Sequence, residues 1–379
     1  MSTAAEVMPF AVRALTAHVL RWPVEVPVRT SFGVMHDRPM VLVRAEDDAG
    51  EVGWGEVWCN FPAVGAEHRA RLVESVFAPL LAGAPAATPA QAFARLTEAT
   101  AVLAIQAGEP GPIAQCIAGI DIALWDLAAR RARVPLWRLL GGTDPEVSVY
   151  ASGINPDAPE KLALERRAEG FTAFKLKVGF GVDRDLANLR AMRAAIGPEA
   201  ALMVDANQGW TLAQAREMAP RLAEFGLGWI EEPLRADSSY ADWKALAADS
   251  GVPLAGGENI AGDAAFDAAL AARVFAVVQP DIAKWGGLSR GLPLARRILA
   301  AGARFCPHYL GGGIGLAASA HLLAAAGGGG MLEVDANRNP LRTAACGTLS
   351  QVRNGRARLD DTPGLGFTPD LEALAALCR

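Results

Sequence analysis

From residue 143 onward, short apolar runs alternate with longer segments in which apolar residues recur every three or four positions. The apolar runs predict buried parallel strands, and longer segments such as 184–196, 212–225 and 288–301 predict helices packed on them. The unit repeats about every 25 to 30 residues. Eight such units favour an α/β fold of the (β/α)8 barrel type, with a doubly wound open sheet as the competing fold. The predicted strands are 147–152, 172–178, 201–206, 228–232, 252–256, 275–280, 303–308 and 331–335.

The preceding residues follow a different pattern. Between about residues 8 and 56, apolar and polar residues alternate, as in Val41–Glu46 before a turn at 47–50, which predicts an antiparallel hairpin. Helical spacing follows from about 66 to 139 and ends at Gly141 and Gly142, a typical helix stop. We therefore expect an α+β domain at 1–142, the barrel at 143–352, and a tail at 353–379 that packs back on the first domain.

Composition and charge exclude several kinds of protein. The 379 residues carry a formal net charge of −5 with no block of lysine or arginine, which disfavours nucleic acid and anionic membranes as partners. No run of 18 apolar residues occurs, and the first residues lack the basic and apolar regions of a signal peptide, so we expect a cytoplasmic protein. The five cysteines are scattered with no CxxC pair, which argues against a disulfide framework and against a thiolate zinc site.

Charged and polar residues gather where the predicted strands end, which is where the active site of a barrel lies. Any one of them alone is more often a helix cap, a salt bridge or a satisfied core group. Apolar strands, however, have no structural need for a titratable group at seven successive ends. These residues are Lys175 and Lys177 on the second strand, Asp205 and Asn207 on the third, Glu231 on the fourth, Glu258 after the fifth, Asp281 on the sixth, His308 on the seventh and Glu333 on the eighth.

Three of these carboxylates suggest a metal site. Asp205, Glu231 and Glu258 are separated by 26 and 27 residues, which is one barrel unit each. They should therefore converge from adjacent strands, where they would repel one another strongly unless a cation lay between them. Oxygen ligands without histidine or cysteine favour Mg²⁺ over zinc or copper.

Candidate bases flank this predicted metal site. Lys175 and Lys177 point to one face of their strand, and repulsion between the two ammonium groups should lower the pKa of Lys177 enough for it to act as a base. On the far side, Asp281 and His308 are 27 residues apart, so the carboxylate can fix the tautomer of the imidazole. Glu333 would donate a hydrogen bond to a substrate oxygen as an acid. Two bases around Mg²⁺ suit removal of the proton α to a carboxylate of a small-molecule substrate, which gives an enediolate.

The sequence resembles the mandelate racemase branch of the mandelate racemase/muconate-lactonizing enzyme family, in the enolase superfamily. The resemblance spans about residues 118 to 335. It rests on ALWDLAARRARVPLWRLLGG, FKLKVG, VDANQGW, WIEEP, GGEN, QPDIAKWGG, the Pro307–His308 pair and MLEVD. Asp281 is what distinguishes this branch from the muconate-lactonizing branch, which has a lysine there.

This resemblance implies a barrel closed at one end by an α+β capping domain, and usually a homo-oligomer. It implies Mg²⁺ held by Asp205, Glu231 and Glu258. It also implies Lys177 and the His308–Asp281 pair as opposed bases, Lys175 as a ligand of the substrate carboxylate, and Glu333 as the electrophilic acid. Lys284 matches a lysine seen in this branch, without a role in the chemistry.

The branch contains racemases, epimerases and many dehydratases of sugar acids, and all of them use the same catalytic set. We expect dehydration of a sugar acid or related hydroxy acid, with racemisation or epimerisation of a 2-hydroxy or amino acid as the alternative. By resemblance, the capping-domain loops 31–39 and 58–65 should select the substrate. The expected substrate-binding residues are His36, Arg38, Trp58 and Asn60, together with Asn207 of the barrel.

Two other classes of protein are also considered, a dehydrogenase and a non-catalytic barrel protein. Residues 313–318 match the GxGxxA pattern of dinucleotide-binding folds and Glu333 follows 20 residues after Gly313, which would indicate an NAD-dependent dehydrogenase. That interpretation leaves the carboxylates and the lysine pair unexplained, and the glycines could instead allow close approach of a ligand or form a flexible loop. A non-catalytic barrel protein would have no use for a complete set of acids and bases.

Overall fold

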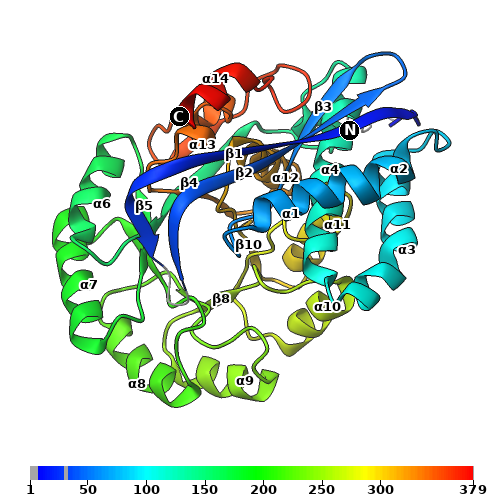
Figure 1. The fold of residues 1–379 in the computed structure, drawn as a ribbon. Helices are drawn as coiled ribbons and strands as arrows, with labels where there is room; N and C mark the ends of the chain where they lie inside the picture. Colours follow the sequence, from blue (N-terminus) through cyan, green and yellow to red (C-terminus); the bar gives the residue numbers. More distant parts are fainter. Residues whose placement is uncertain (1–6, 30–32, 379) are drawn as a thin grey trace.

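Eight parallel strands form the centre of the computed structural model, which describes residues 7–29 and 33–378. They are β4 (Glu146–Ile154), β5 (Ala173–Lys177), β6 (Ala201–Asp205), β7 (Ile230–Glu231), β8 (Leu254–Gly256), β9 (Val277–Val278), β10 (Arg304–Phe305) and β11 (Met331–Asp335). The strands pair in chain order, and β11 pairs with β4, so the last strand lies beside the first. The sheet is therefore curled into a barrel (Figure 1), and the open-sheet alternative is wrong.

The ends of the curled sheet, β10 and β11, meet without a regular ladder of hydrogen bonds. The backbone amide of Met331 donates to Cys306 Sγ at 3.3 Å. Gly330 lies so close to the carbonyl of Phe305 that a Cβ atom there would overlap it. A glycine is therefore required where the last strand begins.

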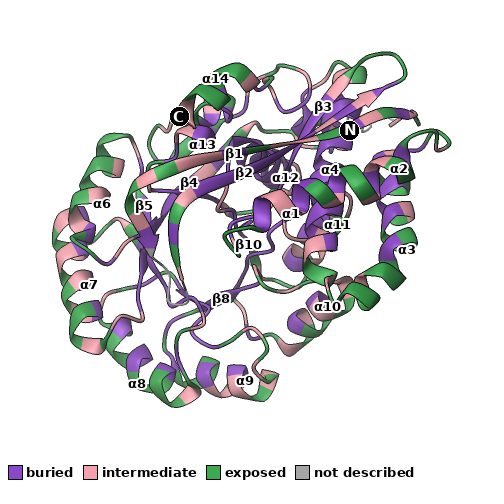
Figure 2. Ribbon diagram, in the orientation of Figure 1, coloured by how far each residue is buried: buried purple, intermediate pink, exposed green. Residues whose placement is uncertain are grey.

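Helices alternate with the strands around the outside of the barrel. They are α6 (Pro159–Ala168), α7 (Val182–Ile196), α8 (Leu212–Ala223), α9 (Tyr240–Asp249), α10 (Asp263–Ala272), α11 (Gly287–Ala300) and α12 (Gly313–Ala326). Helix α8 illustrates why they form, because a capping box of Thr211 and Gln214 starts it and residues at helical spacing, such as Ala215, Met218 and Leu222, are buried against the sheet. The outward faces of α7, α8 and α9 are largely exposed (Figure 2).

A layer of uncharged side chains fills the interior of the barrel. It has one member from each of β4 to β6, together with residues on or beside the next four strands: Tyr150, Ala173, Met203, Trp229, Ala255, Val277 and Cys306. Side chains two residues further along the same strands point to the same side. The second layer therefore begins with Lys175, Asp205 and Glu231, and it faces the carboxyl ends of the strands. The packed lower layer thus sets the depth of the polar residues above it.

The capping domain is an antiparallel sheet covered by helices. The strands are β1 (Val12–Arg29), β2 (Val34–Asp47) and β3 (Val52–Val57), and the helices are α1 (Gly65–Leu72), a π-helical turn η1 (Val73–Phe77), α2 (Ala78–Leu81), α3 (Pro89–Ala107), α4 (Pro110–Arg131) and α5 (Leu136–Leu139). Helix α4 packs directly on β3, where a Cβ atom at Gly55 would overlap the carbonyl of Gly119. In the described residues, α4 is the one helix long and apolar enough to cross a membrane, but 83% of its apolar window is buried inside the protein.

The C-terminal segment returns along both parts of the molecule. It contains α13 (Pro340–Thr343), a 3-10 turn η2 (Gly347–Ser350), β12 (Arg356–Arg358) and α14 (Leu371–Leu377). Strand β12 pairs antiparallel with the barrel strand β4, a pairing that the sequence analysis did not anticipate. Beyond it, the amide of Leu365 donates to Asp126 of α4 at 2.7 Å, so the tail also reaches the capping domain.

Two buried carboxylates of the capping domain bind the amino ends of barrel helices. Asp121 on α4 accepts hydrogen bonds from the amides of Leu288 and Ser289 in α11, at 2.7 and 2.9 Å. Glu56 on β3 accepts from the amides of Gly312 and Gly315 at the start of α12, at 2.5 and 2.9 Å. A carboxylate is favourable at a helix amino terminus, so these contacts fasten the two domains together.

The glycines of the GxGxxA segment serve this packing. A Cβ atom at Gly313 would overlap the carbonyl of Ala345, and one at Gly315 would overlap the ring of Tyr309. Glu56 occupies the amino end of α12, where a dinucleotide fold would bind the pyrophosphate. The dehydrogenase interpretation is therefore wrong, because the close approach is to the protein's own chain.

His321 joins three parts of the fold as a neutral, buried imidazole. Its Nδ1 atom accepts from the amide of Trp137 at 2.9 Å, and Nε2 lies 3.3 Å from the carbonyl oxygen of Leu365. An Nδ1 atom that accepts a hydrogen bond cannot carry a proton. Burial accordingly lowers the pKa of His321 to about 4, although the Leu365 carbonyl opposes the shift.

We expect His321 to make the protein acid-sensitive. Above pH 6.5 the imidazole is neutral whether the chain is folded or not; below it, the unfolded chain binds the proton first, so the folded state loses stability as pH falls towards 4. Two and a half pKa units correspond to about 3 kcal/mol. Urea unfolding at pH 7 and pH 4.5 should show this loss in the wild type and a flatter dependence in His321→Gln. Parallel pH profiles for the two proteins would contradict the assignment.

Candidate active site

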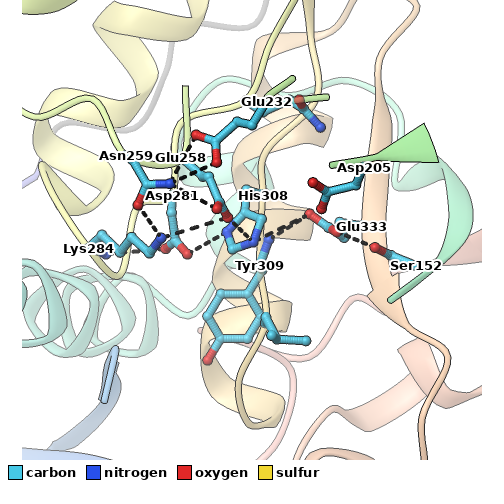
Figure 3. A network of polar contacts seen from close by, with 12 residues as sticks. Ser152, Asp205, Glu232, Glu258, Asn259, Asp281, Lys284, His308, Tyr309 and Glu333 are labelled. Atoms are coloured by element: carbon cyan, nitrogen blue, oxygen red, sulfur yellow. Dashed lines mark hydrogen bonds and ion pairs between the residues drawn. The ribbon is translucent and has the colours of Figure 1, made fainter. Parts of the chain in front are cut away.

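The residues that the sequence analysis selected at the strand ends lie at one end of the barrel. Lys175 and Lys177 lie in β5, Asp205 ends β6, Glu231 ends β7, Glu258 follows β8 by two residues, Asp281 and His308 follow β9 and β10 by three, and Glu333 lies in β11. All are buried except Glu258, whose side chain is 11% exposed. Figure 3 shows part of this network, with Glu258 next to His308. The barrel topology thus gathers groups that are up to 158 residues apart.

Lys175 provides a fixed positive charge at the centre of the site. Its Nζ atom lies 2.5 Å from Glu231 Oε1, 2.8 Å from Glu333 Oε1 and 3.8 Å from Asp205 Oδ2. Burial alone would lower the pKa of this ammonium group, but the surrounding carboxylates outweigh burial and raise it well above its ordinary value. Lys175 is therefore suited to bind an anion and not to exchange a proton.

Lys177 is hydrogen-bonded within the same layer. Its Nζ atom lies 2.6 Å from Asp205 Oδ2 and 2.7 Å from Asn207 Oδ1. Burial and Lys175 lower the pKa of Lys177, but the Asp205 carboxylate raises it more, so the net direction is upward. Lys175 thus lowers the pKa as expected, but the direct ion pair with Asp205, which the sequence spacing did not reveal, outweighs that effect.

His308 and Asp281 form a hydrogen-bonded pair on the other side of the barrel. His308 Nδ1 lies 2.7 Å from Asp281 Oδ2, while Asp281 Oδ1 accepts from the amides of Ala283 and Lys284 at 2.9 and 3.2 Å. His308 Nε2 faces Glu258. Burial lowers the pKa of His308, but Glu258, Glu333 and the bond to Asp281 raise it well above its ordinary value. Four strands separate β10 from β5, so His308 and Lys177 approach from opposite sides.

Glu333 is held as a carboxylate. It accepts from the hydroxyl of Ser152 and, at 3.3 Å, from the amide of Tyr309. Burial raises the pKa of Glu333, but Lys175 and His308 lower it by more than burial raises it, so the net pKa is about 2. Two cations therefore stabilise the ionised form of Glu333 in this arrangement, and its expected role as an acid toward a substrate oxygen stays a prediction.

The carboxylates of the site fit an oxygen-ligated dication by number and charge. Six of them lie together, alongside the ammonium groups of Lys175, Lys177 and Lys284 and the imidazole of His308; they are Asp205, Glu231, Glu232, Glu258, Asp281 and Glu333. Burial, with Asp205 and Glu333, raises the pKa of Glu231 to about 7 despite Lys175, and the pKa of Glu232 is also raised, by burial and by Glu258. This unbalanced negative charge is what a hard cation would neutralise.

The side chains of the three predicted metal ligands do not surround a single point in this structure. Asp205 and Glu231 face Lys175, whereas Glu258 faces His308. Within residues 7–29 and 33–378, no three histidine, cysteine, aspartate or glutamate side chains are close enough to hold a metal ion. The barrel brings the predicted ligands to the same end, while nearby lysine and histidine groups take up their charges.

A cavity of about 230 Å³ opens at this end of the barrel. Its walls come from both domains: Trp58, Asn60, Phe61, Lys177, Asn207, Gln208, Glu258, Asn259, Lys284, His308 and Leu310. Pockets for drug-sized ligands measure roughly 300 Å³ or more, so this smaller cavity suits a smaller molecule. A larger hollow of about 640 Å³ at the opposite end of the barrel, lined by residues such as Arg167 and Arg356, lacks these acid and base groups.

Three of the five expected substrate-binding residues, Trp58, Asn60 and Asn207, line this cavity, and two do not. Arg38 is buried on β2 and forms an ion pair with Asp335 of β11, so it links the domains. His36 is exposed on β2. The expected loop at 31–39 is strand from Val34 onward, with residues 31 and 32 outside the described residues. The regular strand explains why both side chains are directed elsewhere.

Several residues of the site were not selected from the sequence. Four of them lie around Glu258 and the cavity: Glu232, Asn259, Gln208 and Lys284. A fifth is Gln279, whose Nε2 atom donates to Glu231 Oε2 at 2.5 Å. The motifs EEP and GEN already contained two of them, next to the chosen carboxylates.

The backbone beside the site is strained. Asn207, Gln208 and Glu232 have φ values of 44°, 63° and 38°, in the left-handed region that L-residues avoid. Glu232 also precedes a proline, which further restricts its backbone. Such strain is typical of functional sites, where the surrounding structure holds it.

The chain matches two family models. Residues 12–141 match the mandelate racemase/muconate lactonizing enzyme N-terminal domain, and residues 159–374 match the enolase C-terminal domain-like family. D-galactarolactone cycloisomerase from Agrobacterium fabrum is 34% identical over 96% of this chain and 97% of its own length. Arabinonate dehydratase from Saccharolobus solfataricus is 30% identical over 88% of this chain and 89% of its own length.

Solved structures show the same likeness. A mandelate racemase/muconate lactonizing enzyme from Bordetella bronchiseptica is 59% identical, with a TM-score of 0.93 over 98% of this chain and 100% of that one. A racemase from Streptomyces coelicolor with bound magnesium is 30% identical, with a TM-score of 0.85 over 97% of this chain and 100% of that one. The chain therefore belongs to the mandelate racemase/muconate lactonizing enzyme family of the enolase superfamily.

Proposed function

We propose that this protein is a Mg²⁺-dependent enzyme that removes the proton α to the carboxylate of a sugar acid or related hydroxy acid and dehydrates it. One observation carries the proposal. Lys177 and the His308–Asp281 pair reach the same small cavity from opposite sides of the barrel, beside an excess of carboxylates. Relatives named as a sugar-acid dehydratase and a cycloisomerase support this substrate class.

Asp205, Glu231 and Glu258 would hold the ion, and bound Mg²⁺ would supply positive charge opposite the substrate carboxylate. Lys175 adds a second, permanent positive charge on that side. Lys177, in its neutral form, accepts the α-proton at Nζ. Negative charge then grows on the substrate carboxylate, where Lys175 stabilises it.

Loss of water completes the dehydration. His308 donates the proton on Nε2 to the β-hydroxyl while its bond to carbon breaks, and water leaves. The enol that remains tautomerises to a 2-oxo acid. Asp281 keeps Nδ1 of the imidazole protonated through its 2.7 Å contact, so Nε2 is the atom that transfers the proton.

The opposed bases also support a second function, racemisation or epimerisation. In that reaction His308 would return a proton to the face of the α-carbon opposite Lys177, and no bond to the hydroxyl would break. The catalytic residues are the same, so the products distinguish the two functions.

Proton NMR in D₂O tests the proposal. The protein is incubated with Mg²⁺ and a panel of sugar acids, hydroxy acids and amino acids. Dehydration is expected to give a 2-oxo-3-deoxy acid from at least one sugar acid. Deuterium at the α-carbon with an unchanged skeleton would indicate racemisation or epimerisation, and an isomer of unchanged mass with a rearranged ring would indicate cycloisomerisation. Absence of α-proton exchange across the panel would contradict the proposal.

Removal of divalent cations is expected to abolish turnover. The buried carboxylates outnumber the lysine and histidine groups that pair with them, so a dication is needed to balance the charge near the substrate carboxylate. Turnover with the best substrate should fall below detection in excess EDTA and recover when Mg²⁺ is restored. Full activity in excess chelator would rule out a metal requirement.

A further inference from the structure

Asn259 lies at the centre of a chain of polar contacts outside the predicted catalytic set (Figure 3). Its Nδ2 atom lies 2.9 Å from both carboxylate oxygens of Glu232 and 3.0 Å from Glu258 Oε1. Its Oδ1 atom accepts from Lys284 Nζ at 3.2 Å. One amide therefore connects two carboxylates and one ammonium group, using its donor and its acceptor sides for different partners.

These contacts divide the two oxygens of Glu258 between different neighbours. Oε1 accepts from Asn259, whereas Oε2 faces His308 and lies 3.7 Å from Lys284 Nζ. If His308 is to exchange a proton with a substrate, its Nε2 atom must leave Glu258. Among residues 7–29 and 33–378, Asn259 and Lys284 are then the side chains in contact with Glu258 that hold it in place.

Lys284 is itself anchored on its other side. Its Nζ atom lies 4.8 Å from the centre of the Trp58 ring, in a cation–π contact, and its side chain is only 15% exposed. The ammonium group of Lys284 would repel a dication bound at Glu258, because the two charges have the same sign. Lys284 can favour metal binding there only if it holds the Glu258 carboxylate in a suitable orientation.

We propose that Asn259 and Lys284 are positioning residues that orient Glu258 for metal binding, with Lys284 acting through the Asn259 amide and Glu232 fixing the other end of that amide. This inference rests on the metal site of the proposed function. Groups that orient a metal ligand typically change metal affinity by 10- to 100-fold when removed. Asn259 and Lys284 therefore set the affinity for Mg²⁺ without contacting the ion.

The test measures Mg²⁺ binding by titration calorimetry, without substrate. Asn259→Ala and Lys284→Met are each expected to raise the Kd for Mg²⁺ by about 10- to 100-fold. Lys284→Arg, which keeps a donor for Asn259 Oδ1, should stay within about threefold of the wild type. The matched controls are Asn188→Ala on α7 and the exposed Lys244→Met on α9, which should leave the Kd unchanged. Thermal melting shows that each variant is folded.

The sign of the Lys284→Met effect separates positioning from charge. Loss of a nearby positive charge should by itself tighten Mg²⁺ binding, so tighter binding would overturn the proposal. In the double variant, the effect of Lys284→Met should be smaller than in the wild-type background, because part of it passes through the Asn259 amide and the rest through the direct contact with Glu258. Independent, additive effects would overturn that coupling.

Two further outcomes distinguish this inference from the proposed function. If the wild type binds Mg²⁺ and Asn259→Ala binds it with the same Kd, the positioning role is wrong and the metal-dependent function still stands. A wild type that binds no Mg²⁺ would remove both.

Discussion

Lys177→Met is expected to slow exchange of the substrate α-proton by about 10² to 10⁴, the usual contribution of a positioned general base. The variant keeps the length of the side chain but removes the nitrogen that reaches the cavity beside Asp205 and Asn207. Lys175 remains, but its Nζ atom lies among Glu231, Glu333 and Asp205 below the cavity lining, so it cannot replace Lys177 as a base. Exchange from the Lys177 face should therefore be lost.

Lys161→Met serves as the matched control, because Lys161 is exposed on α6, outside the site. Its exchange rate should equal that of the wild type. Proton NMR in D₂O gives the rate directly, and circular dichroism confirms folding. An exchange rate in Lys177→Met within about threefold of the wild type would remove Lys177 from the mechanism.

The barrel was predictable because its signal is local and repeated. Each strand is short and apolar, each helix has one buried face, and the unit recurs along the chain; α7, α8 and α11 begin and end within about two residues of the expected ranges. The closure of the barrel was harder to predict from the sequence. It depends on β11 pairing with β4 and on Gly330 beside Phe305, contacts between distant parts of the chain. The pairing of β12 with β4 was missed for the same reason.

The identity of the strand-end residues was predictable, but their charge states were not. Strand periodicity places Lys175 and Lys177 on one face, and it says nothing about which carboxylate each meets. The ion pair of Lys177 with Asp205 reversed the expected direction of the pKa of Lys177, and Lys175 and His308 together lower the pKa of Glu333. These effects depend on distances of a few ångströms between residues from different strands.

Substrate-facing residues divided according to local structure. Trp58 and Asn60 follow β3, where the chain leaves the sheet and turns over the barrel, and both line the cavity. Arg38 had the same polar character in the sequence but lies within the regular strand β2, and its charge pairs with Asp335. A charged residue in a capping segment could therefore be identified from sequence, whereas its partner 297 residues away could not.

Asp281→Asn is expected to remove His308 as a base almost as completely as removing the imidazole. The wild-type carboxylate uses Oδ1 to accept from the amides of Ala283 and Lys284, and Oδ2 to accept from His308 Nδ1. In the variant, the two backbone amides require the side-chain oxygen, so the new NH₂ group must face His308 Nδ1. Nδ1 must then accept, and the neutral imidazole carries its proton on Nε2, where it cannot take one from substrate.

This tautomer argument predicts a loss confined to one face of the substrate. Exchange from the His308 face should fall by about 10² or more, while exchange from the Lys177 face should persist, because Lys177 reaches the cavity from the opposite side of the barrel. Proton NMR in D₂O with each enantiomer of a substrate measures the two faces separately. His308→Asn is the reference variant, and it should give the same asymmetry. Equal losses on both faces in Asp281→Asn would instead indicate that the aspartate maintains the whole site, and the proposed role in fixing the tautomer would be wrong.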